Sequence, residues 1–210
     1  MKVTIIGNGN MAKGIATRLI GGGHEVIIHA KDETKGNELA EQLKQVSGDA
    51  AVSVAPVGSS ASDIVIVATP YGEIANVAQA YNGFEGKVVV DITNPVDFNT
   101  FQLIPEPGKS GAEEIANQLP GAKIVKAFNT TFAGTLVTGT VEGQELDVFV
   151  ASNDQAAKDK VIELVKTSGM RPIDVGPLSE SRHLEGFGLI QMKIQDQIGT
   201  NWMSALKFIG

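Results

Sequence analysis

Hydrophobic and polar residues follow two alternating patterns along most of this chain. Short apolar runs predict strands buried on both faces, as in a parallel sheet covered by helices. The predicted strands cover residues 2–6, 26–28, 52–54, 63–68, 87–92, 123–128, 146–151 and 171–175. Between them, apolar residues recur at helical spacing, for example over residues 11–20 and 39–46. This alternation predicts an α/β fold with a doubly wound, mostly parallel sheet.

Three segments stand outside the plain alternation. Residues 97–111 contain two prolines among polar residues and are interpreted as a surface loop beside the ligand cleft. Residues 152–155 fit a capping box at a helix start. Beyond residue 176 the apolar residues keep helical spacing to the end of the chain: Leu184, Phe187, Ile190, Ile194, Ile198, Trp202 and Leu206. We therefore predict a domain over residues 1–176 and a helical C-terminal extension over 177–210, whose apolar stripe predicts a homodimer.

Composition and charge narrow the class of protein. The chain has 210 residues, 42% of them hydrophobic, and no cysteine, which excludes disulfides, thiolate catalysis and cysteine-ligated metals. Its net charge of −7 argues against nucleic acid or an anionic membrane as partner. No apolar run is long enough to cross a membrane. We expect a cytoplasmic protein.

The segment that joins the first predicted strand to the first helix carries the clearest motif. Gly7, Gly9 and Ala12 match the pattern G-x-G-x-x-A. The first glycine permits a tight turn, the second lets a pyrophosphate approach the backbone, and the alanine lets helix and strand pack closely. The free N–H groups and the dipole of the helix then stabilise the phosphate charge. We predict a Rossmann dinucleotide site, with a purely structural glycine turn as the alternative, at Gly7, Asn8, Gly9, Asn10, Met11 and Ala12.

The end of the second predicted strand indicates which dinucleotide binds. NAD sites usually place Asp or Glu there, to accept hydrogen bonds from the ribose hydroxyls. This chain has His29, Ala30 and Lys31 instead, and its first carboxylate is that of Asp32. The Lys31 ammonium, assisted by Lys35 or His29, favours a 2′-phosphate, so we predict NADP as the cofactor. The alternative is that both lysines are ordinary solvated charges.

Polar or turn residues also follow three later strands. Ligands of open α/β sheets lie beyond the carboxyl ends of the strands, so these residues are predicted to line the cofactor site. They are Ala68, Thr69, Pro70, Tyr71, Asn94, Pro95, Asn129 and Thr130. Asn94, Asn129 and Thr130 are the candidates for orienting the nicotinamide or its acceptor. X-Pro turns and helix N-caps are structural alternatives for the same residues.

At these positions the sequence resembles a known family, the NADP-dependent oxidoreductases that use the deazaflavin coenzyme F-420. The glycine turn is common to all Rossmann proteins, whereas residues 125–130 are more specific and also resemble the cytosolic reductase domain of the STEAP metalloreductases. The segments that carry the likeness are residues 6–12, 23–26, 68–70, 91–95, 125–130 and 176–178, with Arg182, Leu184 and Glu185.

The resemblance implies an eight-stranded Rossmann domain with a small helical C-terminal part, usually a homodimer, that passes hydride between NADPH and a flavin-like ring. Members hold the 2′-phosphate with a serine and arginines, where this chain has Ala30 and Lys31. We therefore expect an NADP-dependent oxidoreductase whose acceptor is a flavin-like compound, a deazaflavin or a quinone.

Hydride transfer between two aromatic carriers requires mainly that the rings are positioned and water is excluded. No catalytic side chain is therefore assigned, and no metal site is predicted, because histidines and carboxylates do not cluster at ligand spacing. Two alternatives are a non-enzymatic redox sensor that binds NADP(H) and a reductase of the pyrroline-carboxylate or β-hydroxyacid type. The latter needs a longer helical domain than residues 177–210 supply.

Overall fold

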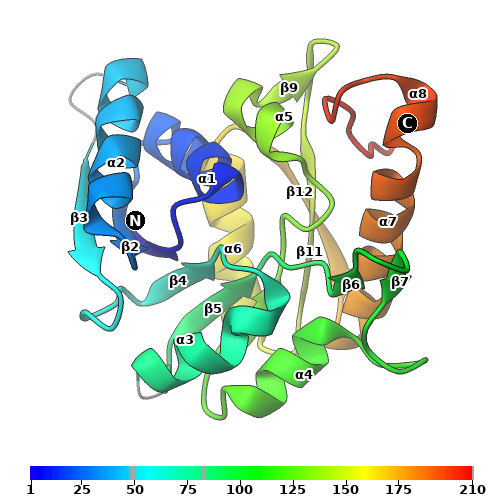
Figure 1. Ribbon diagram of the computed structural model, residues 1–210, viewed down its shortest axis with the longest axis horizontal. Helices are drawn as coiled ribbons and strands as arrows, with labels where there is room; N and C mark the ends of the chain where they lie inside the picture. Colours follow the sequence, from blue (N-terminus) through cyan, green and yellow to red (C-terminus); the bar gives the residue numbers. More distant parts are fainter. Residues whose placement is uncertain (48–50, 82–83, 210) are drawn as a thin grey trace.

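A computed structural model describes residues 1–47, 51–81 and 84–209. Within these residues a single large sheet forms the centre of the molecule, with helices packed against it (Figure 1). Its eight strands stand in the order β12 (Arg171–Gly176), β11 (Asp147–Ser152), β8 (Lys123–Lys126), β5 (Val88–Asp91), β4 (Ile64–Val67), β1 (Lys2–Ile6), β2 (Glu25–Ala30) and β3 (Val52–Pro56). The six strands β3, β2, β1, β4, β5 and β8 run parallel to one another. Strand β11 pairs antiparallel with β8, and β12 runs parallel to β11. The prediction of a doubly wound, mostly parallel Rossmann sheet is confirmed.

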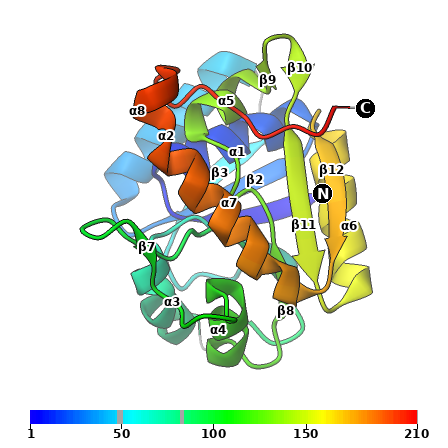
Figure 2. The same cartoon turned by 90° about the vertical axis from the view of Figure 1, so that its right-hand side faces the viewer.

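Helices cover both faces of this sheet and define two apolar cores. The larger core lies under α1 (Asn10–Gly21), α2 (Glu33–Ser47), α5 (Ala133–Thr138) and α6 (Gln155–Thr167). The smaller core lies under α3 (Ile74–Ala80) and α4 (Gly111–Gln118). The helix α7 (Ser181–Lys193) lies across the sheet (Figure 2), and its Leu184 packs against Phe149 and Ala151 of β11. Short helices are η1 (Tyr71–Glu73), η2 (Leu178–Glu180) and α8 (Gln195–Ile198).

The predicted surface loop over residues 97–111 is wrong in its first part. A small antiparallel hairpin forms there from β6 (Val96–Asp97) and β7 (Gln102–Leu103). A second hairpin, β9 (Thr140–Val141) with β10 (Gln144–Glu145), follows α5. Strands of two residues are too short to show an apolar alternation, so the sequence pattern contains no signal for them.

The capping box expected at residues 152–155 is also wrong. Ser152 ends β11, and its hydroxyl donates to the carbonyl of Ile124 at 2.6 Å. The cap of α6 is Asp154, whose carboxylate accepts from the amide of Ala157 at 2.8 Å. The side chain that caps is thus the one that stands directly before the first helical residue.

The C-terminal extension is helical only as far as Ile198. Gly199, Asn201 and Trp202 all have positive φ, which is incompatible with a continuing right-handed helix. The segment after them returns to the sheet, where the buried Asp147 accepts hydrogen bonds from Lys207 Nζ and from the amide of Phe208, both at 3.0 Å. The predicted helix to the end of the chain is therefore wrong, because the apolar spacing of the last residues reflects packing on the sheet edge.

Candidate active site

The two glycines of the turn after β1 have different environments. Gly7 has a φ of +120°, and a Cβ there would lie 2.4 Å from the carbonyl oxygen of Ala68, so the fold itself requires glycine. Gly9 has an extended backbone and caps α1. A Cβ at Gly9 would meet no atom of the described chain within 4 Å. The missing side chain at Gly9 therefore leaves open space in front of the first turn of α1.

That space continues into a surface pocket of about 320 Å³ between the N-terminal ends of α1 and α2. Its lining brings together the turn residues and one predicted phosphate ligand: Asn8, Gly9, Asn10, Lys13, Lys35, Glu38, Leu39 and Gln42. Lys13 was not predicted from the sequence, although a lysine in the first turn after the glycines was a usable signal. Its Nζ donates to Gln42 Oε1 at 2.9 Å. Met11 lies beside the pocket half-buried, and Ala12 is buried in the core as predicted.

Of the two predicted phosphate lysines, Lys31 follows β2 directly and Lys35 lies in the first turn of α2, and both are exposed. Lys31 Nζ forms an ion pair with Glu73 Oε2 at 2.8 Å, and its side chain is 72% exposed. The hydrogen bond from Lys31 lowers the pKa of Glu73. Asp32, the next residue in the sequence, caps α2 by accepting from the amides of Thr34 and Lys35. The preceding Ala30 is buried in the core.

The structure does not bring the His29 imidazole to these lysines. The ring is fully buried and stacks on Tyr81, and its Nδ1 lies 2.6 Å from the Tyr81 hydroxyl. Burial lowers the pKa of His29. The carbonyl of His29 accepts from the amide of Gly7 at 2.9 Å. His29 therefore supports the glycine turn through its backbone, and its predicted contact with the phosphate is not supported.

The segment after β4 borders the glycine turn. Ala68 provides the carbonyl that closes on Gly7, and Pro70 stands directly before η1. The Tyr71 hydroxyl donates to Glu114 of α4. Burial and this neighbouring carboxylate raise the pKa of Tyr71. Tyr71 thus joins η1 to α4, whereas Ala68, Thr69 and Pro70 edge the turn.

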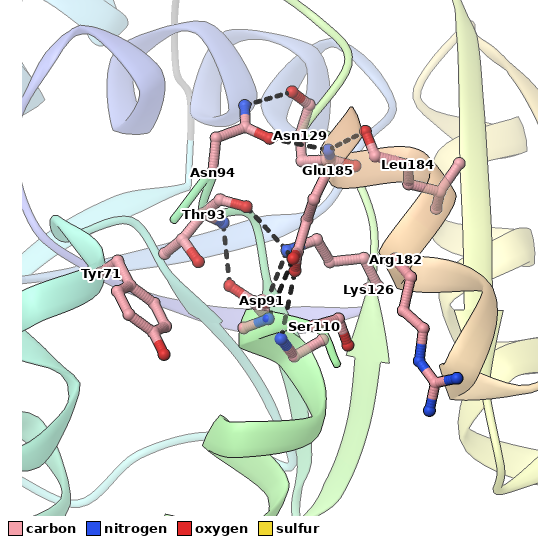
Figure 3. A network of polar contacts seen from close by, with 12 residues as sticks. Tyr71, Asp91, Thr93, Asn94, Ser110, Lys126, Asn129, Arg182, Leu184 and Glu185 are labelled. Atoms are coloured by element: carbon pink, nitrogen blue, oxygen red, sulfur yellow. Dashed lines mark hydrogen bonds and ion pairs between the residues drawn. The ribbon is translucent and has the colours of Figure 1, made fainter. Parts of the chain in front are cut away.

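Asn94 and Asn129 meet at the carboxyl ends of β5 and β8, as Figure 3 shows. Asn94 Nδ2 donates to the carbonyl of Asn129 at 2.7 Å, and Asn129 Nδ2 donates to Asn94 Oδ1 and to the carbonyl of Leu184, both at 2.9 Å. Gly188 makes room for this pair, because a Cβ there would lie 2.4 Å from Asn94 Oδ1. The neighbouring Pro95 packs against the start of α4. The C-terminal extension therefore forms part of the site.

Several polar atoms at these strand ends are buried without a partner. Thr69 Oγ1, Thr93 Oγ1, Asn129 Oδ1 and Thr130 Oγ1 have no hydrogen bond to any residue that the structure describes. Burial of an unpaired polar group costs free energy, and such groups are rare in folded proteins. Four of them at the ends of three neighbouring strands therefore indicate a place that a polar ligand or ordered water fills.

A buried charge network lies next to these groups and was not predicted. Lys126 is fully buried, and its Nζ donates to Asp91 Oδ2 at 2.8 Å, to the carbonyl of Thr93 at 2.7 Å and to Glu185 Oε1 at 2.8 Å (Figure 3). Asp91 Oδ1 accepts the amide of Thr93 at 2.8 Å. Both backbone polar groups of Thr93 are therefore held by this network. A lysine within an apolar strand was the sequence signal for a buried ion pair.

The third member of the network connects it to two helices. Glu185 of α7 accepts the amides of Gly111 and Ala112, the first residues of α4, at 2.9 and 3.2 Å. Burial raises the pKa of Glu185, against the opposing attraction of Lys126. Burial alone would lower the pKa of Lys126, but Asp91 and Glu185 together raise it. The negative charges of Asp91 and Glu185 are thus balanced by the Lys126 ammonium and by the positive end of the α4 dipole.

Among residues 1–47, 51–81 and 84–209, no three His, Cys, Asp or Glu side chains gather closely enough to hold a metal ion. In the same part of the chain, no helix has the length and apolar character needed to cross a membrane.

Comparison with known proteins shows the family of the chain. Residues 2–95 match the family described as "NADP oxidoreductase coenzyme F420-dependent". The chain is 30% identical over 215 residues to an F420-dependent NADP reductase of Methanothermobacter marburgensis, covering 94% of this chain and 95% of that protein. A solved structure described as a putative F420-dependent NADP-reductase from Arthrobacter sp. FB24 superimposes with a TM-score of 0.84 at 30% identity, over 100% of both chains.

Longer proteins share the same domain. Metalloreductase STEAP3 of Rattus norvegicus is 29% identical over 188 residues, which cover 90% of this chain but 36% of the rat protein. The chain thus spans about a third of the length of that relative. The match to the Methanothermobacter protein, in contrast, extends over nearly the whole of both sequences. This chain belongs to the F420-dependent family of NADP oxidoreductases.

Proposed function

We propose that this chain transfers hydride between NADP(H) and a flavin-like or deazaflavin acceptor. The observation that carries the proposal is the open space at Gly9, in front of the N-terminal amides of α1. A Cβ there meets no described atom within 4 Å, so side-chain packing gives no reason for glycine. A pyrophosphate that must approach the amides closely gives one.

The phosphate end of the site is proposed to hold NADP rather than NAD. Lys31 and Lys35 supply positive charge at the end of β2, and Lys13 adds a third ammonium beside the turn. The first carboxylate after β2, that of Asp32, already accepts two amides of α2, and the Glu73 carboxylate is paired with Lys31. This distribution of donors favours a 2′-phosphate over a 2′-hydroxyl.

The other end of the site is proposed to hold the nicotinamide. A carboxamide offers both donors and an acceptor, which suit the unpaired oxygens of Thr93, Asn129 and Thr130. When bound, NADPH supplies the hydride. The contribution of the chain is to orient the ring and exclude water, which needs no titrating side chain at the reacting atoms.

A planar, largely apolar acceptor fits the surroundings of that end. The β6–β7 hairpin begins directly after Pro95 and exposes Phe98, Phe101 and Ile104. The reductases of Methanothermobacter named above are described as F420-dependent, which supports a deazaflavin. The name of the STEAP metalloreductases implies metal substrates. This chain matches only about a third of the length of STEAP3, so those substrates are not carried over to it.

The proposal is tested with Gly9→Val. Since a Cβ at residue 9 meets no described atom, the variant should lose only the N-cap preference for glycine, about 1 kcal/mol of unfolding free energy, but bind NADPH about tenfold more weakly or worse. Gly21→Ala is the matched control, because its added Cβ is also free of contacts with described residues and it lies at the far end of α1. Unchanged NADPH affinity in Gly9→Val, measured by fluorescence titration, contradicts the proposed site.

Turnover assays separate an enzyme from a sensor. NADPH oxidation is followed with coenzyme F420, with free flavins and with quinones. We expect the highest kcat/KM with the deazaflavin. NADPH binding without oxidation by any of these acceptors would favour the non-enzymatic sensor instead.

A homodimer and a cytoplasmic location are proposed with the function. Phe187, Ile190 and Phe208 expose apolar surface on α7 and the last segment, which supports a partner there. A monomeric mass at micromolar concentration, by light scattering, would contradict the dimer.

A further inference from the structure

One ion pair crosses the sheet at the end where the nucleotide is proposed to bind. Lys31 follows β2, Glu73 lies in η1 after β4, and their Nζ and Oε2 atoms are 2.8 Å apart. In the sheet, β1 stands between β2 and β4. The pair therefore spans the carboxyl end of β1, where the glycine turn begins. This is the crevice in which α/β sheets of this topology bind nucleotides.

The ion pair also engages the Lys31 ammonium, which is the positive charge that a 2′-phosphate would bind. The lysine ammonium is a compact charge on a flexible stem, and here its hydrogen-bonding partner is the Glu73 carboxylate. Asn76 Nδ2 donates to the same Glu73 oxygen at 3.2 Å, which helps to orient the carboxylate toward Lys31. A phosphate dianion and this carboxylate are thus alternative partners for one ammonium.

We propose that Glu73 is a specificity-determining residue that competes with the 2′-phosphate of NADP(H) for Lys31. This inference rests on the proposed NADP function. When NADP(H) binds, its 2′-phosphate replaces the Glu73 carboxylate as the partner of Lys31. The lysine therefore keeps an anionic partner, and the new partner carries the higher charge. NAD(H) carries a hydroxyl in that place and has no group that replaces Glu73. Glu73 therefore lowers the affinity for NADP(H) and leaves that for NAD(H) almost unchanged.

The variant Glu73→Gln tests the competition, because it keeps the shape of the side chain and removes its charge. Exposed ion pairs contribute little, so we expect NADPH to bind about two- to fivefold more tightly and NADH affinity to change by less than about twofold. Glu25→Gln is the matched control. It breaks the Lys2–Glu25 pair, which is similarly exposed with atoms 2.9 Å apart and lies at the opposite end of β2, so both affinities should stay as in the wild type.

A double-mutant cycle assigns the effect to Lys31. In a Lys31→Met background, Glu73→Gln should no longer improve NADPH binding, since the competing ammonium is absent. The proposal is overturned if Glu73→Gln leaves the NADPH affinity unchanged, or if its gain persists without Lys31. It is also overturned if the variant weakens both nucleotides, because Glu73 would then contact the nucleotide itself. Wild-type protein that binds neither nucleotide defeats the proposed function, a result seen before any variant is compared.

Discussion

The two ends of the proposed cofactor site hold their charges in opposite ways. At the end of β2, the Lys31–Glu73 pair is exposed to water, and each partner is free to exchange. At the ends of β5 and β8, Lys126, Asp91 and Glu185 are buried, and every Nζ hydrogen of the lysine has a partner. The first arrangement suits an exchange of anions. The second suits the fixed placement of backbone and amide groups against a ring.

The difference in burial also decides what a substitution disturbs. Exposed ion pairs contribute about 0–1 kcal/mol, since water screens them and the long side chains lose entropy. A buried charge that loses its partner remains desolvated, which costs about 3–5 kcal/mol. Substitutions at the phosphate end should therefore change affinity with little effect on folding. Substitutions at the interior end should change folding first.

The largest effect is expected for Lys126→Met. The apolar side chain would leave Asp91 and Glu185 buried without their ammonium, and the free energy of unfolding should fall by about 3–5 kcal/mol. Denaturant titration measures this loss. Lys123→Met is the control on the same strand, because the Lys123 side chain is 42% exposed and its ion pair with Asp154, at 3.4 Å, is open to water. Equal stability of the two variants would remove the contrast between the ends.

A third buried carboxylate, that of Asp147, extends the contrast to acid pH. Burial alone would raise the pKa of Asp147, but hydrogen bonds from Arg171, Phe208 and Lys207 lower it to about 2. Because the pKa in the unfolded chain is about 3.9, ionised Asp147 stabilises the fold above that pH. Its contribution of about 2–3 kcal/mol is lost as the pH falls from about 4 towards 2.

The stability difference between wild type and Asp147→Asn should therefore be large at pH 5 and shrink towards pH 2. Unfolding by urea across that range measures it. Asp159→Asn changes an exposed carboxylate on α6 and serves as the control, with a small difference at every pH. A constant difference for Asp147→Asn would mean that its carboxylate is not the titrating group.

Substitutions at two glycines of α7 test the close packing at the interior end of the site. A Cβ at Gly188 would overlap Asn94, so Gly188→Ala should lower the free energy of unfolding by about 1–3 kcal/mol. Gly186→Ala adds the same methyl group where no described atom lies within 4 Å, and should raise stability by up to about 1 kcal/mol through helix propensity. Opposite signs in thermal unfolding are the expected outcome. A lower free energy of unfolding in both variants would mean that α7 tolerates no added methyl group, whether or not it contacts Asn94.

The smallest effect on folding is expected at the phosphate end. Lys31→Glu should weaken NADPH binding about tenfold, the loss of one charge-assisted hydrogen bond, and change NADH binding and stability little. Fluorescence titration with both nucleotides measures the ratio. Lys44→Glu makes the same charge change at an exposed lysine in the last turn of α2 and is the control. Equal losses for NADPH and NADH would mean that Lys31 does not contact the phosphate.

The same contrast explains what could be predicted from the sequence. Strand β1 and helix α1 show complete local patterns, an apolar run and helical spacing around a glycine motif, and both were located correctly. The Ser110–Glu113 capping box of α4 was an equally local signal, but it lay inside the segment interpreted as a loop.

Asn94, Asn129 and Thr130 of the interior half were predicted, but its charge network could not be, because it depends on contacts distant in sequence. Lys126 shows only that a charge stands in an apolar strand, and its partners Asp91 and Glu185 lie 35 and 59 residues away. His29 illustrates the reverse error. Its position after the glycines suggested a phosphate contact, whereas tertiary packing buries the ring against Tyr81.

The contact of Glu185 with the first amides of α4 has a consequence for the order of assembly. Gly111 and Glu185 are separated by 74 residues, so the start of α4 is synthesised well before the carboxylate that accepts its amides. Until α7 arrives, Lys126 of β8 and the first amides of α4 lack one anion, and these polar groups, which the finished molecule conceals, remain uncovered. Closure of long-range contacts is slow, which makes docking of α7 a natural late step in folding.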